Sequence, residues 1–156
     1  MNQETRNLLI VEDDSELLSL IKSKLDSKNI SYDSACAVKE GMMKVDEVKF
    51  KIISLDISLG DENAAQIITH ISSQNYHLNK GSIFVVFSQH VNNDFKIKMR
   101  KKGIKAYNKS KEFNEYIDWL IETLEDRTVG EFEKLLEDDV FDSLAEGMIN
   151  LEKMDI

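Results

Sequence analysis

The stretch LLIVEDDSELL, residues 8–18, contains the pattern on which the predicted fold depends. It begins with four consecutive apolar residues, which is typical of a strand covered on both faces in a parallel sheet. Acidic residues follow directly, and leucines at helical spacing then begin an amphipathic helix. A buried strand that ends in carboxylates and leads into a helix is a building unit of open α/β sheets.

The same unit recurs along the chain. Apolar runs predict five strands, at residues 8–11, 30–35, 52–55, 83–87 and 104–107. Apolar residues at helical spacing follow each of them, over residues 17–25, 38–48, 64–71, 95–99 and 113–124. The second strand is polar enough to lie at an edge of the sheet, and the fifth is the weakest. This alternation predicts a doubly wound α/β fold with a five-stranded parallel sheet.

Polar side chains follow most of these strands. In a parallel sheet the carboxyl ends of all strands lie along one edge, so the residues that follow them come together. The residues in these positions are Glu12, Asp13, Asp14, Asp56, Ser88 and Lys109. Clustered carboxylates suit a hard cation such as Mg²⁺, and an aspartate beside such an ion can attack a phosphoryl group. Asp14 or Ser15 has a second interpretation, as the N-cap of the first helix.

The composition limits the class of protein. The chain has 156 residues, 42% of them hydrophobic, and no apolar run approaches the roughly 20 residues that a membrane-spanning helix needs. The start, MNQETRN, lacks the features of a secretory signal, and one cysteine cannot form an internal disulfide, so we expect a cytoplasmic protein. The net charge of −9 argues against direct binding to nucleic acid or to an anionic membrane.

The charge is unevenly distributed along the chain. Residues 1–111 contain 17 basic and 14 acidic residues, whereas residues 112–156 contain 3 and 15. A short break precedes a predicted amphipathic helix over about residues 131–154, whose apolar stripe needs burial against the preceding helix or another protomer. We therefore expect a folded domain over residues 1–127 and an acidic C-terminal helical extension over residues 128–156.

Four motifs together resemble the receiver domain of two-component response regulators. They are LLIVEDDSELL (8–18), IISLDISLGDENAAQII (52–68), IFVVFSQH (83–90) and GIKAYNKSKEF (103–113). The resemblance covers roughly residues 6–125, with all five strand and helix units in order. It implies the flavodoxin-like fold of receivers and a phosphoprotein in a phosphorelay. Such a domain is not a turnover enzyme, because it catalyses only its own phosphorylation and dephosphorylation.

The resemblance also implies the residues of a phosphorylation site. Asp56 would accept the phosphoryl group. Mg²⁺ would be held by Glu12, Asp13, Asp56 and the backbone carbonyl of Ser58. Lys109 would form an ion pair with Asp56 or with the phosphate.

Further residues would transmit and tune the reaction. By the same resemblance, Ser88 would bind a phosphoryl oxygen and move toward it, and Tyr107 would change its rotamer with that movement. Gln89 would narrow the access of phosphodonors, while Ser58 and His90 would tune the lifetime of the phosphoryl group.

The resemblance implies partners as well. A sensor histidine kinase or a histidine phosphotransfer protein would donate the phosphoryl group, and an unidentified downstream protein would receive the signal. No effector domain fits in residues 126–156, so we expect a stand-alone receiver that acts by contact. Basic residues around the predicted fourth helix and acidic ones on the fifth lead us to expect a homodimer favoured by phosphorylation.

Several positions depart from the family pattern. Gly60, Ala64 and Ser110 stand where Pro, Gly and Pro are usual. The spacing from Tyr107 to Lys109 is one residue shorter than usual, and a shift of one residue turns a strand side chain to the opposite face. Either the last strand contains a compensating irregularity or Tyr107 is not the switch. These departures leave open a degenerate receiver, which would be an interaction module independent of phosphorylation.

Two other kinds of site receive little support from the sequence. Phosphatases of the haloacid dehalogenase type have an acid two residues after the nucleophile, whereas Ser58 stands at that spacing from Asp56. His70, His77 and His90 have no metal-ligand spacing, and we expect each of them in solvent.

Overall fold

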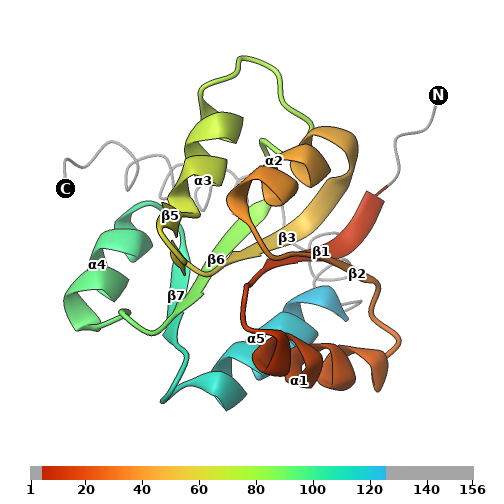
Figure 1. Cartoon of the computed structure of the whole chain (residues 1–156), viewed down its shortest axis with the longest axis vertical. Helices are drawn as coiled ribbons and strands as arrows, with labels where there is room; N and C mark the ends of the chain where they lie inside the picture. The colour runs from red at the N-terminus through yellow and green to blue at the C-terminus, as the bar shows by residue number, and fades with distance from the viewer. Residues whose placement is uncertain (1–4, 126–156) are drawn as a thin grey trace, which may run out of the picture.

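Five main strands alternate with five helices along residues 5–125, the part of the chain that the computed structural model describes (Figure 1). The strands are β1 (Thr5–Val11), β2 (Tyr32–Ala35), β3 (Lys49–Leu55), β6 (Ile83–Ser88) and β7 (Lys105–Asn108). The helices are α1 (Ser15–Asp26), α2 (Val38–Glu47), α3 (Ala65–Ser72), α4 (Asn93–Lys101) and α5 (Phe113–Leu124). None of these helices has the length and apolar character needed to cross a membrane. The predicted extension over residues 128–156 lies outside the described residues.

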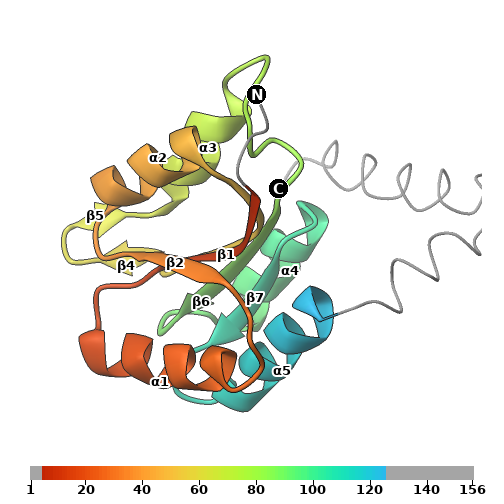
Figure 2. The same cartoon turned by 90° about the vertical axis from the view of Figure 1, so that its right-hand side faces the viewer.

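The main strands form one parallel sheet in the order β2-β1-β3-β6-β7. Helices α1 and α5 cover one face, and α2, α3 and α4 cover the other (Figure 2). The chain first moves outward from β1 to β2 and then returns past β1 to β3. The carboxyl ends of β1 and β3 therefore form the switch point at which open α/β sheets bind ligands. The predicted doubly wound fold is confirmed.

Both faces of the central strands are buried, which explains why these strands show no polar alternation. In β1, Leu8 and Ile10 pack toward α1 and α5, where Tyr116 is fully buried. Leu9 and Val11 pack toward α2 and α3. Successive side chains of a strand point to opposite faces, so a strand covered twice needs apolar residues at every position.

A short hairpin that the sequence did not predict follows β3. It pairs β4 (Ser58–Leu59) with β5 (Glu62–Asn63), and each strand has only two residues. Gly60 turns between them with φ of +57°. Proline fixes φ near −65°, so the residue that is usual at this position in the family cannot adopt this turn.

Candidate functional site

Three carboxylates lie together at the carboxyl ends of β1 and β3. Glu12 and Asp13 follow β1, and Asp56 follows β3, where its N–H donates to the Val11 carbonyl oxygen at 3.0 Å. One carboxylate oxygen of each acid lies within 4.8 Å of the others. Glu12 and Asp56 are buried, whereas Asp13 is exposed. The topology thus brings together acids that are more than 40 residues apart in the chain.

Lys109 adds a cation to this cluster from the loop after β7. Its Nζ lies 2.6 Å from Asp56 Oδ2 and 2.7 Å from Glu12 Oε1, and its side chain is 10% exposed. The Lys109 N–H donates to the Ser88 carbonyl oxygen at 3.2 Å, which holds the loop beside β6. The short spacing before Lys109 therefore does not prevent contact with Asp56.

Burial and the ion pairs raise the pKa values of both Glu12 and Lys109, for different reasons. Burial raises the pKa of Glu12 to about 7, and hydrogen bonds from Lys109 and the Asp14 N–H only partly offset this. Burial by itself lowers the pKa of Lys109, but hydrogen bonds to Asp56 and Glu12 outweigh it and hold that pKa above its usual value. Lys109 therefore stays charged, and Glu12 is the group that changes protonation near neutral pH.

The pKa of Glu12 leads us to expect that the domain loses stability as the pH rises from about 4.5 to about 7. The folded protein binds the Glu12 proton more tightly than the unfolded chain, so ionisation in this window favours unfolding. The free energy of unfolding should fall by up to about 1.4 kcal/mol per pH unit. Urea unfolding at a series of pH values, in metal-free buffer, measures this slope. Glu12→Gln should flatten it, and equally steep profiles in both proteins would contradict the assignment.

Ser88 contributes a hydroxyl at the carboxyl end of β6. The residue is 2% exposed, and its Oγ has no hydrogen-bond partner among residues 5–125. A buried polar group without a partner costs about 1–3 kcal/mol, and such groups are uncommon in folded proteins. An oxygen-rich ligand such as a phosphoryl group would satisfy this hydroxyl.

The carboxylates suit a hard divalent cation. Mg²⁺ prefers oxygen ligands and usually takes one or two carboxylates together with water. Asp13, on the exposed side, and Asp56 would be its direct ligands, while Glu12 lies deeper. Ser58 is exposed, and its N–H donates to Asp56 Oδ1 at 3.1 Å, so its backbone lies beside the same carboxylate. The donor set therefore fits Mg²⁺.

Three other residues from the sequence analysis lie around this cluster. The Oδ1 of Asp14 accepts the N–H groups of Glu16 and Leu17 at 3.1 Å each, so Asp14 is the N-cap of α1 and is not part of the carboxylate group. Gln89 and His90 are exposed in the loop after β6.

Asn108 links the loop that follows Ser88 to the loop that carries Lys109, a role that the sequence did not reveal. Its Nδ2 donates to the carbonyl oxygens of Gln89 and Val91 at 3.1 and 3.0 Å, and its Oδ1 accepts the N–H groups of Ser110 and Lys111 at 2.9 and 3.1 Å. These contacts shape the turn at Ser110, where the family usually has Pro. Asparagine is a common turn residue, but its partners across the loops follow only from the tertiary structure.

The predicted switch role of Tyr107 does not agree with the register of β7. Phe87 pairs with Tyr107 and Ser88 with Asn108, without a bulge. Tyr107 packs on the α5 side, with its ring centroid 6.0 Å from that of Tyr116. Ser88 belongs to the opposite face, because Val86, two residues earlier, packs on the α4 side. The structure therefore does not bring Tyr107 into the space that a movement of Ser88 would vacate.

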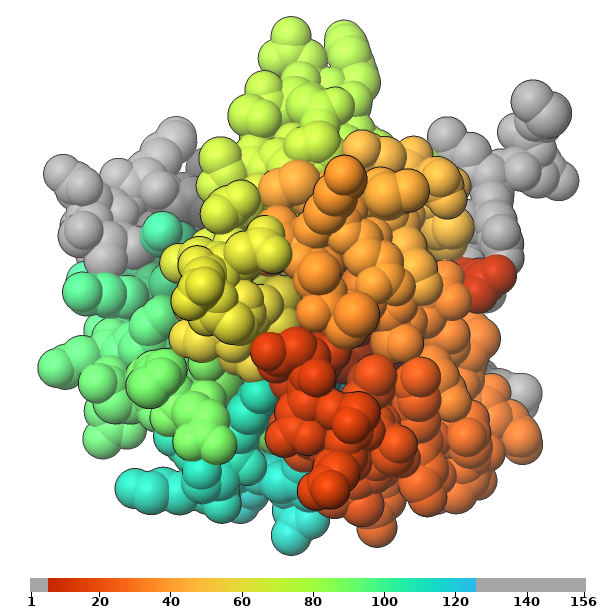
Figure 3. All heavy atoms as spheres, in the orientation of Figure 1, coloured from red at the N-terminus to blue at the C-terminus, as the bar shows by residue number. Residues whose placement is uncertain are grey.

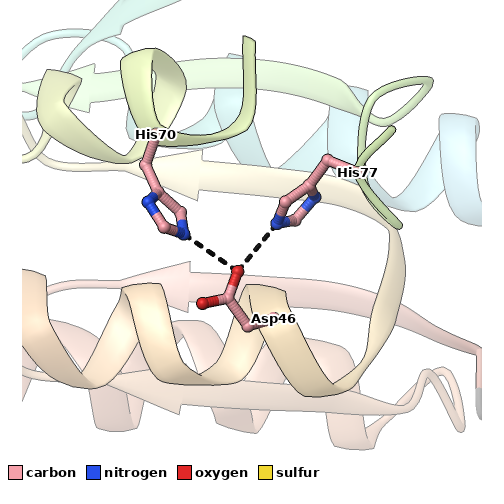
Figure 4. Close-up of side chains that lie close together, drawn as sticks. All are labelled: Asp46, His70 and His77. Carbon is pink, nitrogen blue, oxygen red and sulfur yellow. Dashed lines mark hydrogen bonds and ion pairs between the residues drawn. The ribbon is translucent and has the colours of Figure 1, made fainter. Parts of the chain in front are cut away.

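Two of the three histidines also lie differently from the expectation. His70 Nε2 and His77 Nε2 both contact Asp46 Oδ1, at 2.9 and 2.8 Å (Figure 4). The side chain of His77 is only 4% exposed, so the prediction that it lies in solvent is wrong. His77 lies beyond the end of α3, and Asp46 belongs to another helix, so no local pattern indicates this cluster. His90 is exposed, as expected.

Several solved structures are similar to this fold. The receiver domain of the Francisella response regulator 1452 has a TM-score of 0.66 at 20% identity, over 79% of this chain and 98% of that one. The beryllofluoride-activated NtrC4 receiver domain dimer has a TM-score of 0.63 at 22% identity, over 77% of this chain and 97% of that one. A Burkholderia pseudomallei response regulator with a phosphorylated aspartic acid, a calcium ion and citrate has a TM-score of 0.61 at 16% identity, over 83% and 71%.

In sequence, the chain matches a family model but no individual curated protein. No curated protein sequence matches this chain. The family model of the response regulator receiver domain, however, matches residues 8–120, more than half of the chain. This range contains the three carboxylates, Ser88 and Lys109, and its fold agrees with that of the solved receivers. The chain belongs to the response regulator receiver domain family.

Proposed function

We propose that the protein accepts a phosphoryl group on Asp56 in a Mg²⁺-dependent reaction in the cytoplasm and signals through altered protein contacts. Receiver domains are signalling modules that receive phosphoryl groups from kinases or phosphotransfer proteins. The donor here would be the phosphohistidine of a sensor histidine kinase or of a histidine phosphotransfer protein. The observation that carries the proposal is the buried carboxylate of Asp56, which pairs with Lys109 and lies within 4.8 Å of two further acids. The unpartnered hydroxyl of Ser88 ends the neighbouring strand at the same edge of the sheet.

Asp56, Lys109 and Ser88 each have a separate role in the phosphoryl transfer. A carboxylate oxygen of Asp56 attacks phosphorus, an O–P bond forms while the P–N bond breaks, and the electron pair leaves with the imidazole nitrogen of the donor, which takes up a proton from solvent. Lys109 moves its ion pair from the carboxylate to the phosphoryl oxygens, and Ser88 donates its hydroxyl hydrogen to one of them. When bound, Mg²⁺ supplies positive charge that stabilises the same oxygens.

Two observations favour this function over a degenerate receiver. Lys109 reaches Asp56 at 2.6 Å despite the shortened spacing that put its role in doubt. The similar Burkholderia pseudomallei regulator contains a phosphorylated aspartic acid together with a divalent ion, which supports the same chemistry here. A phosphatase lacks support, because the exposed Ser58 provides no carboxylate for general acid catalysis.

Intact-mass measurement with a small phosphodonor tests the proposal. The protein is incubated with phosphoramidate, a donor small enough for narrow access past Gln89, in Mg²⁺ or in EDTA. We expect the mass of one phosphoryl group in Mg²⁺ and none in EDTA. Equal modification in both buffers would contradict the role of the cation, and no modification in Mg²⁺ would favour the degenerate receiver.

Asn108→Ala should slow this phosphorylation by roughly tenfold or more, because the loop after Ser88 and the loop of Lys109 lose four hydrogen bonds of Asn108. Asn108→Asp keeps the oxygen that accepts the hydrogen bonds of the turn and loses the amide donor. Its phosphorylation rate should therefore lie between those of the wild type and Asn108→Ala. Asn92→Ala is the matched control, since it removes only the cap of α4. Time courses of intact mass give the rates, and a wild-type rate in Asn108→Ala would contradict the positioning role.

The charged helices support a homodimer as one form of output. In α4, Lys98, Arg100 and Lys101 are cationic, and α5 with its C-cap exposes acidic residues at positions 115, 118, 122 and 125. A second copy could pair these surfaces, and the similar NtrC4 receiver is a dimer in its activated form. Light scattering with and without beryllofluoride tests this, and an unchanged monomer mass would exclude it.

A further inference from the structure

A second cluster of potential metal ligands lies at the edge of the sheet opposite the Asp56 site. Asp46 stands near the end of α2, His70 in α3, and His77 in the loop that leads to β6 (Figure 4). Asp46 comes just before β3, whereas Asp56 follows that strand. Seven residues of extended chain place the two clusters about 20 Å apart. The two sites can therefore be studied separately.

The three side chains converge on one point from three segments of the chain. Both Nε2 atoms contact the same carboxylate oxygen, Asp46 Oδ1, and the ligand atoms of all three residues lie within 4.8 Å of one another. The side chains of Asp46 and His70 are 49% and 30% exposed, so an ion can approach from solvent. Hydrogen bonds from the two imidazoles hold the pKa of Asp46 below its usual value, although burial acts in the opposite direction.

The position of His77 is held by its neighbours. Its Nδ1 accepts the N–H of Asn79 at 2.9 Å, and the buried side chain of Asn79 is in turn bonded to the backbone of α2 and β3. The imidazole is thus already oriented with Nε2 toward Asp46.

We propose that Asp46, His70 and His77 form a binding site for a divalent transition-metal ion, with Zn²⁺ as the best fit. Two imidazole nitrogens and one carboxylate oxygen are typical zinc ligands, and water would occupy the fourth position. Mg²⁺ prefers oxygen ligands and would not compete for this site. In a tetrahedral zinc site the ligand atoms lie about 3.3 Å apart, so the present contacts would open by roughly 0.5 Å.

Binding would exchange protons as well as contacts. In the metal-free protein the Asn79 N–H occupies the lone pair of His77 Nδ1, so the ring proton is on Nε2 and is donated to Asp46. Zinc at Nε2 requires this proton to move to Nδ1, and the Asn79 hydrogen bond is then lost. This loss should weaken zinc binding by roughly tenfold compared with a site in which no hydrogen bond has to break. We therefore expect a dissociation constant in the micromolar range.

Zinc titration of the tag-free, chelator-treated full chain tests the proposal. Excess Mg²⁺ is present throughout to compete at the Asp56 site, and a chromophoric zinc chelator reports the affinity. We expect one equivalent of zinc at micromolar affinity in the wild type. His70→Gln and Asp46→Asn, at partly exposed positions, should each bind at least tenfold more weakly. His90→Gln, which changes the third and exposed histidine, should bind like the wild type.

The visible spectrum of bound Co²⁺ in the wild type adds a readout that does not depend on how any variant folds. Co²⁺ in a tetrahedral site with nitrogen and oxygen ligands absorbs strongly in the visible range, and the wild type should give this band whereas His70→Gln should not. Asp56→Asn should retain it, since that residue belongs to the other cluster. If zinc is not bound stoichiometrically, or if His70→Gln and Asp46→Asn bind like the wild type, the cluster only joins α2 and α3 by hydrogen bonds and the proposal is wrong.

Discussion

Asp56→Asn should abolish phosphorylation by phosphoramidate while the domain stays folded. The amide has nearly the shape of the carboxylate, but it provides no anionic oxygen to attack phosphorus. In the native protein the two oxygens of Asp56 accept the Ser58 N–H and the Lys109 ammonium group. An amide can serve only one of these donors, so we expect a loss of stability of about 1–2 kcal/mol.

The loss stays small because the rest of the cluster compensates. Lys109 keeps its ion pair with Glu12, and removal of the Asp56 charge takes away a repulsion that raises the pKa of Glu12. Intact mass after incubation with Mg²⁺ and phosphoramidate measures the reaction, and a urea titration measures stability. Asp61→Asn, an exposed change in the same segment, is the control and should be modified normally. Modification of Asp56→Asn would show that another residue accepts the phosphoryl group.

Lys109→Met should have the largest effect on stability. It removes the cation that pairs with Asp56 and Glu12, both of which are at least 95% buried. Buried charges without a partner are costly, and removal of one partner of a buried pair destabilises a protein by about 3–5 kcal/mol. Protonation of Glu12 would recover part of this, so we expect a loss of about 3 kcal/mol at neutral pH.

Mg²⁺ distinguishes this electrostatic effect from a packing effect. A divalent ion near the carboxylates replaces the lost positive charge, so Mg²⁺ should stabilise Lys109→Met more than the wild type. Urea unfolding in Mg²⁺ and in EDTA measures the difference, and Lys111→Met, an exposed change two residues later, is the control. Equal stabilisation of Lys109→Met and wild type by Mg²⁺ would contradict this explanation.

The fold was predictable from the sequence because its central strands are buried on both faces. Apolar runs at β1, β3 and β6 have no other simple interpretation when helices with one apolar face follow them. The predicted strand ends were less accurate. Polar residues 5–7 extend β1, and residues 49–51, in which two lysines flank the buried Phe50, extend β3. The β4–β5 hairpin is too short to leave a periodic pattern in the sequence.

The candidate site was predictable where topology alone places the residues. Glu12, Asp13 and Asp56 come together because parallel strands end at one edge, whatever the side-chain packing. The contacts of Asn108 and the Asp46, His70 and His77 cluster depend on how loops and helices pack against one another, so no spacing in the sequence indicates them.

Tyr107 shows the limit of a resemblance between motifs. The chemical type of this residue agrees with the family, but its position in the strand decides which face it occupies. The regular pairing of Phe87 with Tyr107 places the ring toward α5, while Ala106 occupies the α4 side. A shift of one residue therefore separates an aromatic side chain of the expected type from its expected role.

The position of the phosphoryl group is the most direct test of the central claim. Wild-type protein is phosphorylated with phosphoramidate and Mg²⁺ and then treated with borohydride, which reduces an aspartyl phosphate to homoserine. Peptide mass spectrometry then locates the reduced residue. We predict that the reduction occurs at Asp56 and at no other acidic residue. Reduction at Glu12 or Asp13, or a phosphoryl group on Ser88, would contradict the account.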